Sequence, residues 1–330
     1  LDLLLDCFSF SSLLFPSVMS LYTPPTFSNF GKSNLFQVYD KDSLDHTVKL
    51  VNRSAAGVSF EQGLVFAPKS NPRGYVKTNF GFQGVVVDTQ IQTDASKVSS
   101  ITFKKKNVLA KNLPGLNVSL AVNSSDKDFS AKPKYGFFST TSADYTRQGF
   151  AATAAVSSDE DSNHSITASA AIGFDGFSVG GDVKLIKTAD KSSLVAKSYN
   201  AGVAYQKKNY TGSLVSDAKF EKLKATLLAA KVGPDAQFTL GAQAKVDLQK
   251  PKDGEPQREV ILSVEQKASK QTTYRLATVV TSGVIVGSVE HKLVNPSLTL
   301  SASVATAMPN SAFAPFAANK FGVNLAFGEN

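Results

Sequence analysis

The sequence predicts an all-β protein, a transmembrane β-barrel of about 19 strands with a short amino-terminal helix. Three observations support this fold class. The 330-residue chain has 42% hydrophobic residues, 23 Phe and no Trp, yet only 19% of its residues are charged. It has no apolar run that approaches the roughly 20 residues of a membrane-spanning helix. From about residue 46 to the carboxyl end, apolar and polar residues alternate in segments that turn residues separate.

These patterns divide the chain into three parts. Residues 1–18 contain two Asp and the only cysteine, Cys7, but no Lys or Arg. A mitochondrial presequence is rich in Arg and poor in acids, and a secretory signal begins with positive charge. We therefore expect residues 1–18 to be a leader, non-native or untranslated, that the mature protein lacks. Residues 19–45 form an amino-terminal segment with the helix, and residues 46–330 form the barrel.

The helix is predicted from Thr26, which follows two prolines and can cap about 12 to 14 residues with one apolar face. A helix of this length is too short to span a bilayer. It lies either on the membrane surface or inside the barrel, and the pattern alone favours neither place. The candidates for a helix inside the lumen are Phe27, Phe30, Gly31, Lys32, Leu35 and Val38.

The barrel strands are predicted from alternation with a period of two residues. From Phe238 to Leu248, apolar residues occupy every second position, and polar residues such as Thr239 and Lys245 occupy the other face. Such a strand has one dry face and one wet face. Similar segments are Ile166 to Phe174, Phe177 to Leu185 and Leu298 to Val304. We count about 19 segments of roughly ten residues, the length that crosses a bilayer when tilted.

A soluble β-sandwich is the structural alternative, because its strands alternate too. Sandwich strands usually have about five or six residues, whereas the segments here are nearly twice as long and only short turns separate them. So many long strands close more readily into a barrel than into two packed sheets.

The carboxyl end, from Lys320 to Phe327, has the pattern of a closing strand. It alternates small or polar with apolar side chains, and it resembles the sorting signal of mitochondrial outer-membrane barrels. The residues that carry this pattern are Lys320, Gly322, Val323, Leu325 and Phe327. We expect a charge introduced at Gly322 or Phe327 to meet lipid and to prevent insertion.

Several stretches resemble the voltage-dependent anion channels, the eukaryotic mitochondrial porins. The opening from Tyr22 to Ser33 is similar to the start of that family. Leu113-Pro114-Gly115-Leu116 is similar to its Pro-Gly-Leu-Lys strand start, and Ile172 to Phe177 to its glycine and aromatic hairpin. The resemblance implies a 19-strand barrel whose first and last strands pair in parallel, with the helix inside the pore.

The chain departs from the family pattern at four places. Asn117 stands where the family has a Lys after Pro-Gly-Leu, a residue that is linked to nucleotide contact. Leu35 and Phe36 replace a basic and acidic pair in the helix. Thr89 stands where the family has a membrane-facing carboxylate in strand four, and Thr278 stands where it has a basic residue near strand sixteen. A nucleotide site at Asn117 and the usual helix electrostatics are therefore not expected.

The predicted lumen carries more basic than acidic side chains if the apolar face of each strand meets lipid. The basic candidates are Lys32, Lys77, Lys104, Lys106, Lys134, Lys184, Lys224, Lys245 and Lys267, and the acidic ones are Asp88, Asp182, Asp247 and Glu265. Bases exceed acids by about two to one, which predicts that anions are favoured.

Enzyme motifs are weak in this chain. Gly176 to Gly180 matches a nucleophile elbow, but it opens an alternating strand instead of a strand-turn-helix unit. His46, His164 and His291 have no metal-ligand spacing. We therefore predict no enzyme activity, no cofactor and no metal site.

The function implied by the resemblance is a voltage-gated, weakly anion-selective diffusion pore for small metabolites and ions in the mitochondrial outer membrane. The expected partners are the lipid bilayer, small anions and metabolites including nucleotides, and the barrel-assembly machinery of that membrane. Assembly with further copies of the chain stays open, and no nucleic acid is expected. Two rivals are the preprotein-conducting barrel of the outer-membrane translocase and a soluble lipid-binding or adhesive β-protein.

Overall fold

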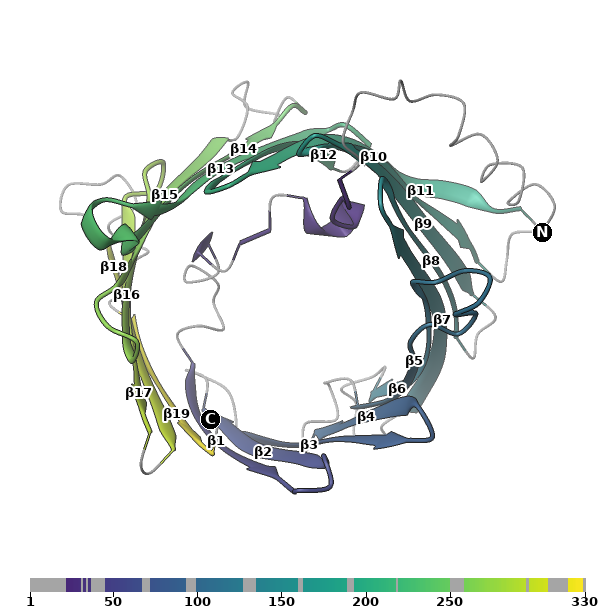
Figure 1. The fold of residues 1–330 in the computed structure, drawn as a ribbon, viewed down its shortest axis with the longest axis horizontal. Coiled ribbons are helices and arrows are strands. Elements are labelled where there is room, and N and C mark those ends of the chain that lie inside the picture. The colour runs from purple at the N-terminus through teal and green to yellow at the C-terminus, as the bar shows by residue number, and fades with distance from the viewer. Residues whose placement is uncertain are drawn as a thin grey trace.

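The chain forms one closed sheet of 19 strands around an open centre in the computed structural model (Figure 1). Strands that are consecutive in the chain are neighbours in the sheet, and they pair antiparallel throughout. This confirms the predicted fold class. The structure describes residues 22–30, 32–33, 35–36, 45–66, 72–92, 99–126, 135–159, 163–188, 193–217, 219–249, 258–294, 297–307 and 320–328.

The strands have 7 to 13 residues each. They are β1 (His46–Arg53), β2 (Ser59–Phe66), β3 (Arg73–Phe82), β4 (Val85–Gln92), β5 (Ser99–Lys105), β6 (Leu116–Asp126), β7 (Tyr135–Arg147), β8 (Phe150–Asp159), β9 (His164–Phe174), β10 (Phe177–Lys187), β11 (Val195–Lys207), β12 (Tyr210–Asp217), β13 (Lys222–Val232), β14 (Phe238–Asp247), β15 (Arg258–Lys267), β16 (Thr272–Val279), β17 (Val284–Leu293), β18 (Leu298–Ala307) and β19 (Lys320–Phe327). A 3₁₀ turn, η5 (Pro234–Ala236), joins β13 to β14.

The ring closes where β1 and β19 pair in parallel, with Thr47 opposite Asn324 and Leu50 opposite Phe327. Strand direction reverses at every turn, so an odd number of strands must leave one parallel pair. On this seam Thr47 Oγ1 donates a hydrogen bond to Asn324 Oδ1. The parallel closure that the family resemblance implied is therefore confirmed.

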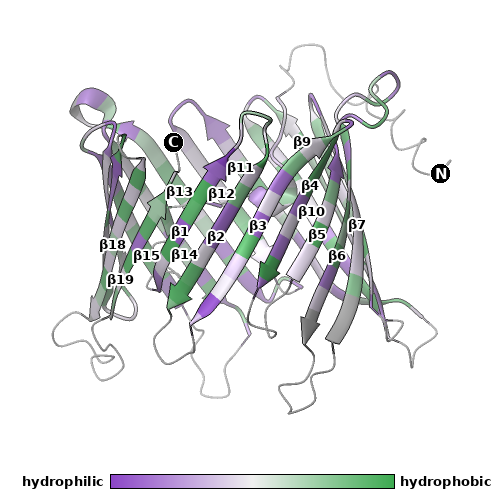
Figure 2. Ribbon diagram, turned by 90° about the horizontal axis from the view of Figure 1, so that it is seen from below, coloured by the Kyte–Doolittle hydropathy of each residue, from purple (hydrophilic) through white to green (hydrophobic). Residues whose placement is uncertain are grey.

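Alternation along the strands matches the prediction. β14 occupies the segment in which the period of two was clearest, and β9, β10 and β18 occupy the three similar segments. Figure 2 shows hydrophobic and hydrophilic residues alternating along individual strands. Among the described residues, no helix is both long enough and apolar enough to cross a membrane.

The amino-terminal segment lies inside the ring, against part of its wall (Figure 1). The segment contains one 3₁₀ turn, η2 (Phe27–Asn29), and a short 3₁₀ stretch that includes Leu35 and Phe36, but the Phe30 backbone is extended, with φ −60° and ψ 122°. The prediction of a continuous helix of 12 to 14 residues from Thr26 is therefore wrong. Ser28 and Asn29 are poor helix formers, and the Asn29 side chain donates to Thr26 Oγ1, which occupies the oxygen that would cap a helix.

Two groups of buried apolar residues lie where this segment meets the wall. Phe27 and Phe30 pack against Ala171 and Ala204. Farther along, Phe36 packs against a separate group, which consists of Ile261, Ala277 and Val279. The segment thus meets the wall at two apolar groups, and within the part of the chain that the structure describes no packed core fills the centre of the ring.

Candidate pore and its lining

Contacts of the amino-terminal segment identify the inner face of the sheet. A β-carbon added at Gly241 would lie 2.6 Å from Leu35 Cδ2, and one added at Gly173 would lie 2.6 Å from the Tyr22 carbonyl oxygen. Because the segment lies inside the ring, both glycines face the lumen. Both are places where any side chain would push the segment away from the wall.

The pairing register extends this assignment around the whole ring. Residues directly opposite each other on antiparallel strands share a face, and faces alternate along each strand. Opposite residues lead from Gly241 to Leu228, then to Thr211, and onward across β11 and β10 to Gly173. In this register Gly173 lies on the same face as Gly241. Two independent contacts therefore agree on which residues face inward.

Charged residues gather on this inner face. In the described strands the inward bases are Lys49, Arg53, Arg73, Lys77, Lys104, Lys184, Lys222, Lys224, Lys245, Lys267, Arg275 and Lys292, and the inward acids are Glu61, Asp88, Asp144, Asp159, Asp182, Asp217, Asp247, Glu259, Glu265 and Glu290. Such a surface holds water and ions.

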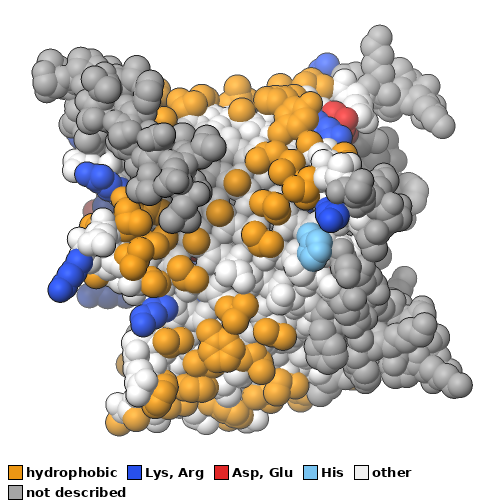
Figure 3. Space-filling model, turned by 90° about the vertical axis from the view of Figure 1, so that its right-hand side faces the viewer, with side chains coloured by type: hydrophobic (Ala, Val, Ile, Leu, Met, Phe, Trp, Pro, Cys, Tyr) orange, Lys and Arg blue, Asp and Glu red, His pale blue; other side chains and the backbone are white. Residues whose placement is uncertain are grey.

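The outer face is apolar and exposed. Leu227 and Phe321 are each 65% exposed although both belong to strands. Figure 3 shows hydrophobic side chains spread over the wall around β7 and β8, with Lys and Arg side chains near the rims. A soluble protein rarely exposes so large an apolar surface, whereas a barrel in lipid requires it.

Aromatic rings mark one end of this apolar surface. We call this the turn end; it carries the connections 54–58, 83–84, 106–115 and 148–149. The Phe177 ring lies 4.6 Å from the Tyr205 ring and 6.1 Å from the Phe174 ring, and the Tyr145 and Phe150 rings lie 6.3 Å apart (centroid distances). Rows of this kind lie at membrane interfaces in transmembrane barrels.

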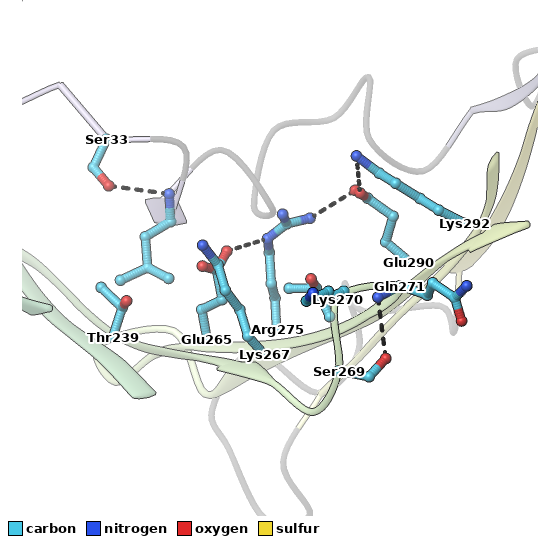
Figure 4. Close-up of a pocket in the computed structure, with 12 residues that line it drawn as sticks. Ser33, Thr239, Glu265, Lys267, Ser269, Lys270, Gln271, Arg275, Glu290 and Lys292 are labelled. Carbon is cyan, nitrogen blue, oxygen red and sulfur yellow. Dashed lines mark hydrogen bonds and ion pairs between the residues drawn. The ribbon is translucent and has the colours of Figure 1, made fainter. Parts of the chain in front are cut away.

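Most inward charges between β13 and β17 form ion pairs across strands. Arg275 has the most extensive set: its Nε donates to Glu265 Oε2 at 2.7 Å and its Nη1 to Glu290 Oε2 at 3.3 Å. Lys292 Nζ lies 3.5 Å from the other oxygen of Glu290. Figure 4 shows the Arg275 guanidinium between the two carboxylates. Two further pairs in this part of the wall are Lys245–Glu259 at 2.6 Å and Lys222–Asp247 at 3.5 Å.

A hollow of about 670 Å³ lies between this network and the amino-terminal segment. Ser33 and Leu35 line one side of it, and the turn between β15 and β16 contributes Ser269 and Lys270. The Ser33 hydroxyl accepts a hydrogen bond from the Leu35 backbone N–H at 3.2 Å, which helps to hold the segment at this place. The hollow is therefore polar and open to the lumen.

A group of three lysines lies farther from the turn end than the Arg275 network. Lys224 is opposite Lys245 on β14, and Lys32 of the amino-terminal segment is within electrostatic reach of Lys224. Within the described chain, neither Lys32 nor Lys224 forms an ion pair. Lys32, Lys224 and Lys245 thus bring three bases together in this part of the lumen, where Asp217 is the acid within electrostatic reach of Lys224.

Comparison with known families matches the geometry. A family model described as eukaryotic porin matches residues 23–322. The chain belongs to the eukaryotic porin family. That match confirms the resemblance found at both ends of the sequence, and it removes the soluble β-protein from consideration. A search of curated proteins finds no match to this porin.

The porin's register places most of the predicted pore residues on the inner face. These are Lys77, Lys104, Lys184, Lys224, Lys245, Lys267, Asp88, Asp182, Asp247 and Glu265. Lys106 follows the end of β5 and lies exposed in the β5–β6 loop, outside the barrel wall. Lys134, Gly31 and Val38 lie outside the described residues, as do residues 1–21.

Several inward charges were missing from the sequence prediction. Arg275 alternates with the outward residues Tyr274 and Leu276, and this period of two could have identified it. The family's basic residue near strand sixteen was assigned to Thr278, which faces outward, so Arg275 supplies the basic side chain of that strand. The missing acids, such as Glu259 and Glu290, change the balance. Bases exceed acids only slightly, and the expected two-to-one excess is wrong.

The closing strand needs one correction. Gly322 is opposite Ser303 and shares the inner face with Asn324 and Ala326, whereas Val323, Leu325 and Phe327 face outward. A charge at Gly322 would therefore enter the lumen and not the lipid. Lys320 is opposite Ala305 in the register. Thr89, at the place of the family's membrane-facing carboxylate, does face outward, and its hydroxyl pairs with that of Thr78 at 2.6 Å.

The motifs that the sequence analysis considered for chemistry can be located in the structure. No three His, Cys, Asp or Glu side chains there come close enough together to hold a metal ion. The elbow-like motif Gly176 to Gly180 opens β10, as its alternation predicted. Asn117 faces the lumen, and its side-chain oxygen accepts the Asn107 backbone N–H at 3.2 Å, so it braces a loop.

Proposed function

We propose that this porin is a voltage-gated, weakly anion-selective diffusion pore for small metabolites and ions in the mitochondrial outer membrane. The observation that carries the proposal is the closed 19-strand ring with charges inside and apolar residues outside. A ring of about eight strands is filled by its own side chains, whereas this number leaves an aqueous channel. Transport then needs no chemical step, and the porin family is a family of channels.

Weak anion preference follows from the balance of the lining. Paired charges such as Arg275 with Glu265 largely cancel at a distance. The residual field comes from bases such as Lys32, Lys224 and Lys267, which have no ion pair within the described chain. Lys32 and Lys224 lie where the segment narrows the lumen. A net positive charge at a narrow place raises local anion concentration, and salt screens the effect.

Voltage gating is assigned to the amino-terminal segment. It carries Lys32 and contacts the wall through two separate apolar groups, one at Phe27 and Phe30 and the other at Phe36. Leu35, next to Phe36, adds an apolar contact with the wall at Gly241. A charged segment held by two small contacts can change position in a membrane field without disturbing the ring, because no strand depends on it.

The test is a single-channel recording of refolded protein in a planar bilayer. We expect an open pore that closes at high voltage of either sign, and a reversal potential in a potassium chloride gradient that favours chloride. The rival preprotein-conducting barrel would instead be blocked by the polypeptides that it conducts. Absence of conductance in protein that is inserted and protease-resistant would overturn the pore itself.

A further inference from the structure

We propose that the β5–β6 loop and its surroundings bind anionic phospholipid headgroups at the turn end of the barrel. The surface consists of Lys105, Lys106, Lys111 and Arg147, with Val108 and Leu109 between the lysines. It lies outside the pore, and no part of the proposed transport function uses it. The proposal requires that the barrel lies in a membrane, and it is independent of selectivity and gating.

The charge of this surface has one sign only. From residue 99 to residue 125 the chain has four Lys and no Asp or Glu. Lys105 and Arg147 occupy outward positions at the ends of β5 and β7, since Lys105 is opposite the outward Val85 and Arg147 is opposite Phe150. Among the described acids, none forms an ion pair with these bases. This contrasts with the lumen, where most bases have a carboxylate partner.

The loop has a fixed shape that presents apolar residues. Its two ends are joined by a hydrogen bond from the Val108 backbone N–H to the Leu116 carbonyl at 2.9 Å. Asn107 Oδ1 accepts the Gly115 N–H at 3.0 Å, and the Leu113 N–H donates to the Leu109 carbonyl at 2.7 Å. Val108 and Leu109 are nevertheless 38% and 47% exposed.

The place of the loop matches a membrane interface. Its base is tied to the end of β7, where the Thr146 N–H donates to the Gly115 carbonyl at 3.4 Å. In Figure 1 the loop projects past the outer edge of the wall beside β7, and Figure 3 shows Lys and Arg side chains along the rim of this face. The aromatic rows of Tyr145 and Phe150 lie directly beneath. Aromatic residues settle at headgroup depth, so the loop lies among the headgroups.

The chemistry therefore favours a lipid surface as the occupant. Lysine stems can lie along apolar surface while their ammonium groups reach phosphates. Each Lys or Arg near an anionic membrane surface contributes about a fivefold gain in association, or about 1 kcal/mol. Apolar side chains between lysines can enter the acyl boundary, which a purely solvated loop would not need. An acidic protein is the competing occupant, and the experiment below separates it.

The experiment places a fluorescent reporter in the loop. Cys7 is the only cysteine, so Cys7→Ser/Leu109→Cys carries a single label on the full chain. The labelled protein is refolded into phosphatidylcholine vesicles with a minority of phosphatidylglycerol, and brominated chains are placed on one lipid or the other. We expect quenching per brominated lipid to be severalfold greater for phosphatidylglycerol, and high salt to reduce this ratio.

The decisive variants carry matched charge changes. Lys105→Gln/Lys111→Gln should bring the quenching ratio close to one. Lys208→Gln/Lys231→Gln removes the same charge from exposed lysines at the turn end, near the ends of β11 and β13. This control should leave the quenching ratio unchanged. A ratio of one in the parent protein, which docking of an acidic protein predicts, overturns the proposal, as does an equal loss in both variants. Conductance recorded from the same preparation reports separately on the pore.

Discussion

Two stretches of the inner wall share a fold and differ in chemistry. From β6 to β9 about half of the inward side chains are hydroxyls, and several of them pair across strands, as in Ser119–Ser142 at 2.6 Å and Thr153–Ser169 at 2.7 Å. From β13 to β17 charged side chains are more frequent on the inner face and most of them form ion pairs, with Arg275 as the most connected. We call these the hydroxyl stretch and the ion-pair stretch.

The difference shows which properties the barrel requires and which it leaves open. Both stretches have the same period of two and the same apolar outer face, because lipid and the pleat impose them. Water on the inner side accepts either hydroxyls or charges. The amino-terminal segment extends from the edge of the hydroxyl stretch, at Ala171, to the ion-pair stretch, at Ile261. Selectivity and segment attachment can therefore vary while the ring is unchanged.

The largest expected effect tests the face assignment on which this comparison depends. Phe327→Asp places a carboxylate on the lipid face of the closing strand, where it pairs with β1. A charge on this face costs roughly 2 to 4 kcal/mol near mid-bilayer and less toward the interface. We expect carbonate-resistant insertion to fall strongly. Its neighbour Ala326 faces the lumen, so Ala326→Asp should insert like the wild type. Equal insertion of both variants would refute the assignment of faces.

A smaller effect on stability should separate the two stretches. Arg275→Ala leaves Glu265 and Glu290 facing each other without their shared cation, and hydrogen bonds to charged groups contribute about 1.5 to 3 kcal/mol. Thr153→Ala removes one neutral hydrogen bond, worth about 1 kcal/mol or less. Urea unfolding of the refolded barrels should show the larger fall in midpoint for Arg275→Ala. The comparison of the stretches fails if Thr153→Ala costs as much.

Some of this arrangement could be predicted from the sequence and some could not. Alternation identified β14 and its inward Lys245, because a period of two needs only one strand. It could not supply the partner Glu259, since opposition across strands depends on register. The family resemblance pointed to Thr278 by position, although the parity of β16 favoured Arg275. The helix prediction failed because an apolar face can also be buried as separate contacts, as Phe27 and Phe36 are.

Detachment of the segment should be measurable in single channels. Phe36 is buried against Ile261 and Ala277 in the ion-pair stretch, and removing a buried Phe side chain costs about 3 to 5 kcal/mol in a packed core. Phe36→Ala should give larger or noisier open conductance and weaker voltage closure. Phe103→Ala removes the same side chain from the outer face, and its conductance should equal that of the wild type. Identical recordings from both variants would rule out a segment held by Phe36.

The smallest expected effect concerns selectivity, and it asks whether the two sides of the lumen contribute differently. Lys224 lies near Lys245 and Lys32, whereas Lys184 is two residues from the inward Asp182 on β10. Each change to Glu alters the lumen charge equally, but Lys224→Glu acts where like charges add and the segment narrows the passage. The reversal potential in a potassium chloride gradient at low salt should therefore move toward cations more for Lys224→Glu than for Lys184→Glu. High salt should reduce both shifts, because the Debye length falls to about 3 Å at 1 M. Equal shifts would mean that only net charge matters, and a larger shift for Lys184→Glu would move the selective region to the hydroxyl side.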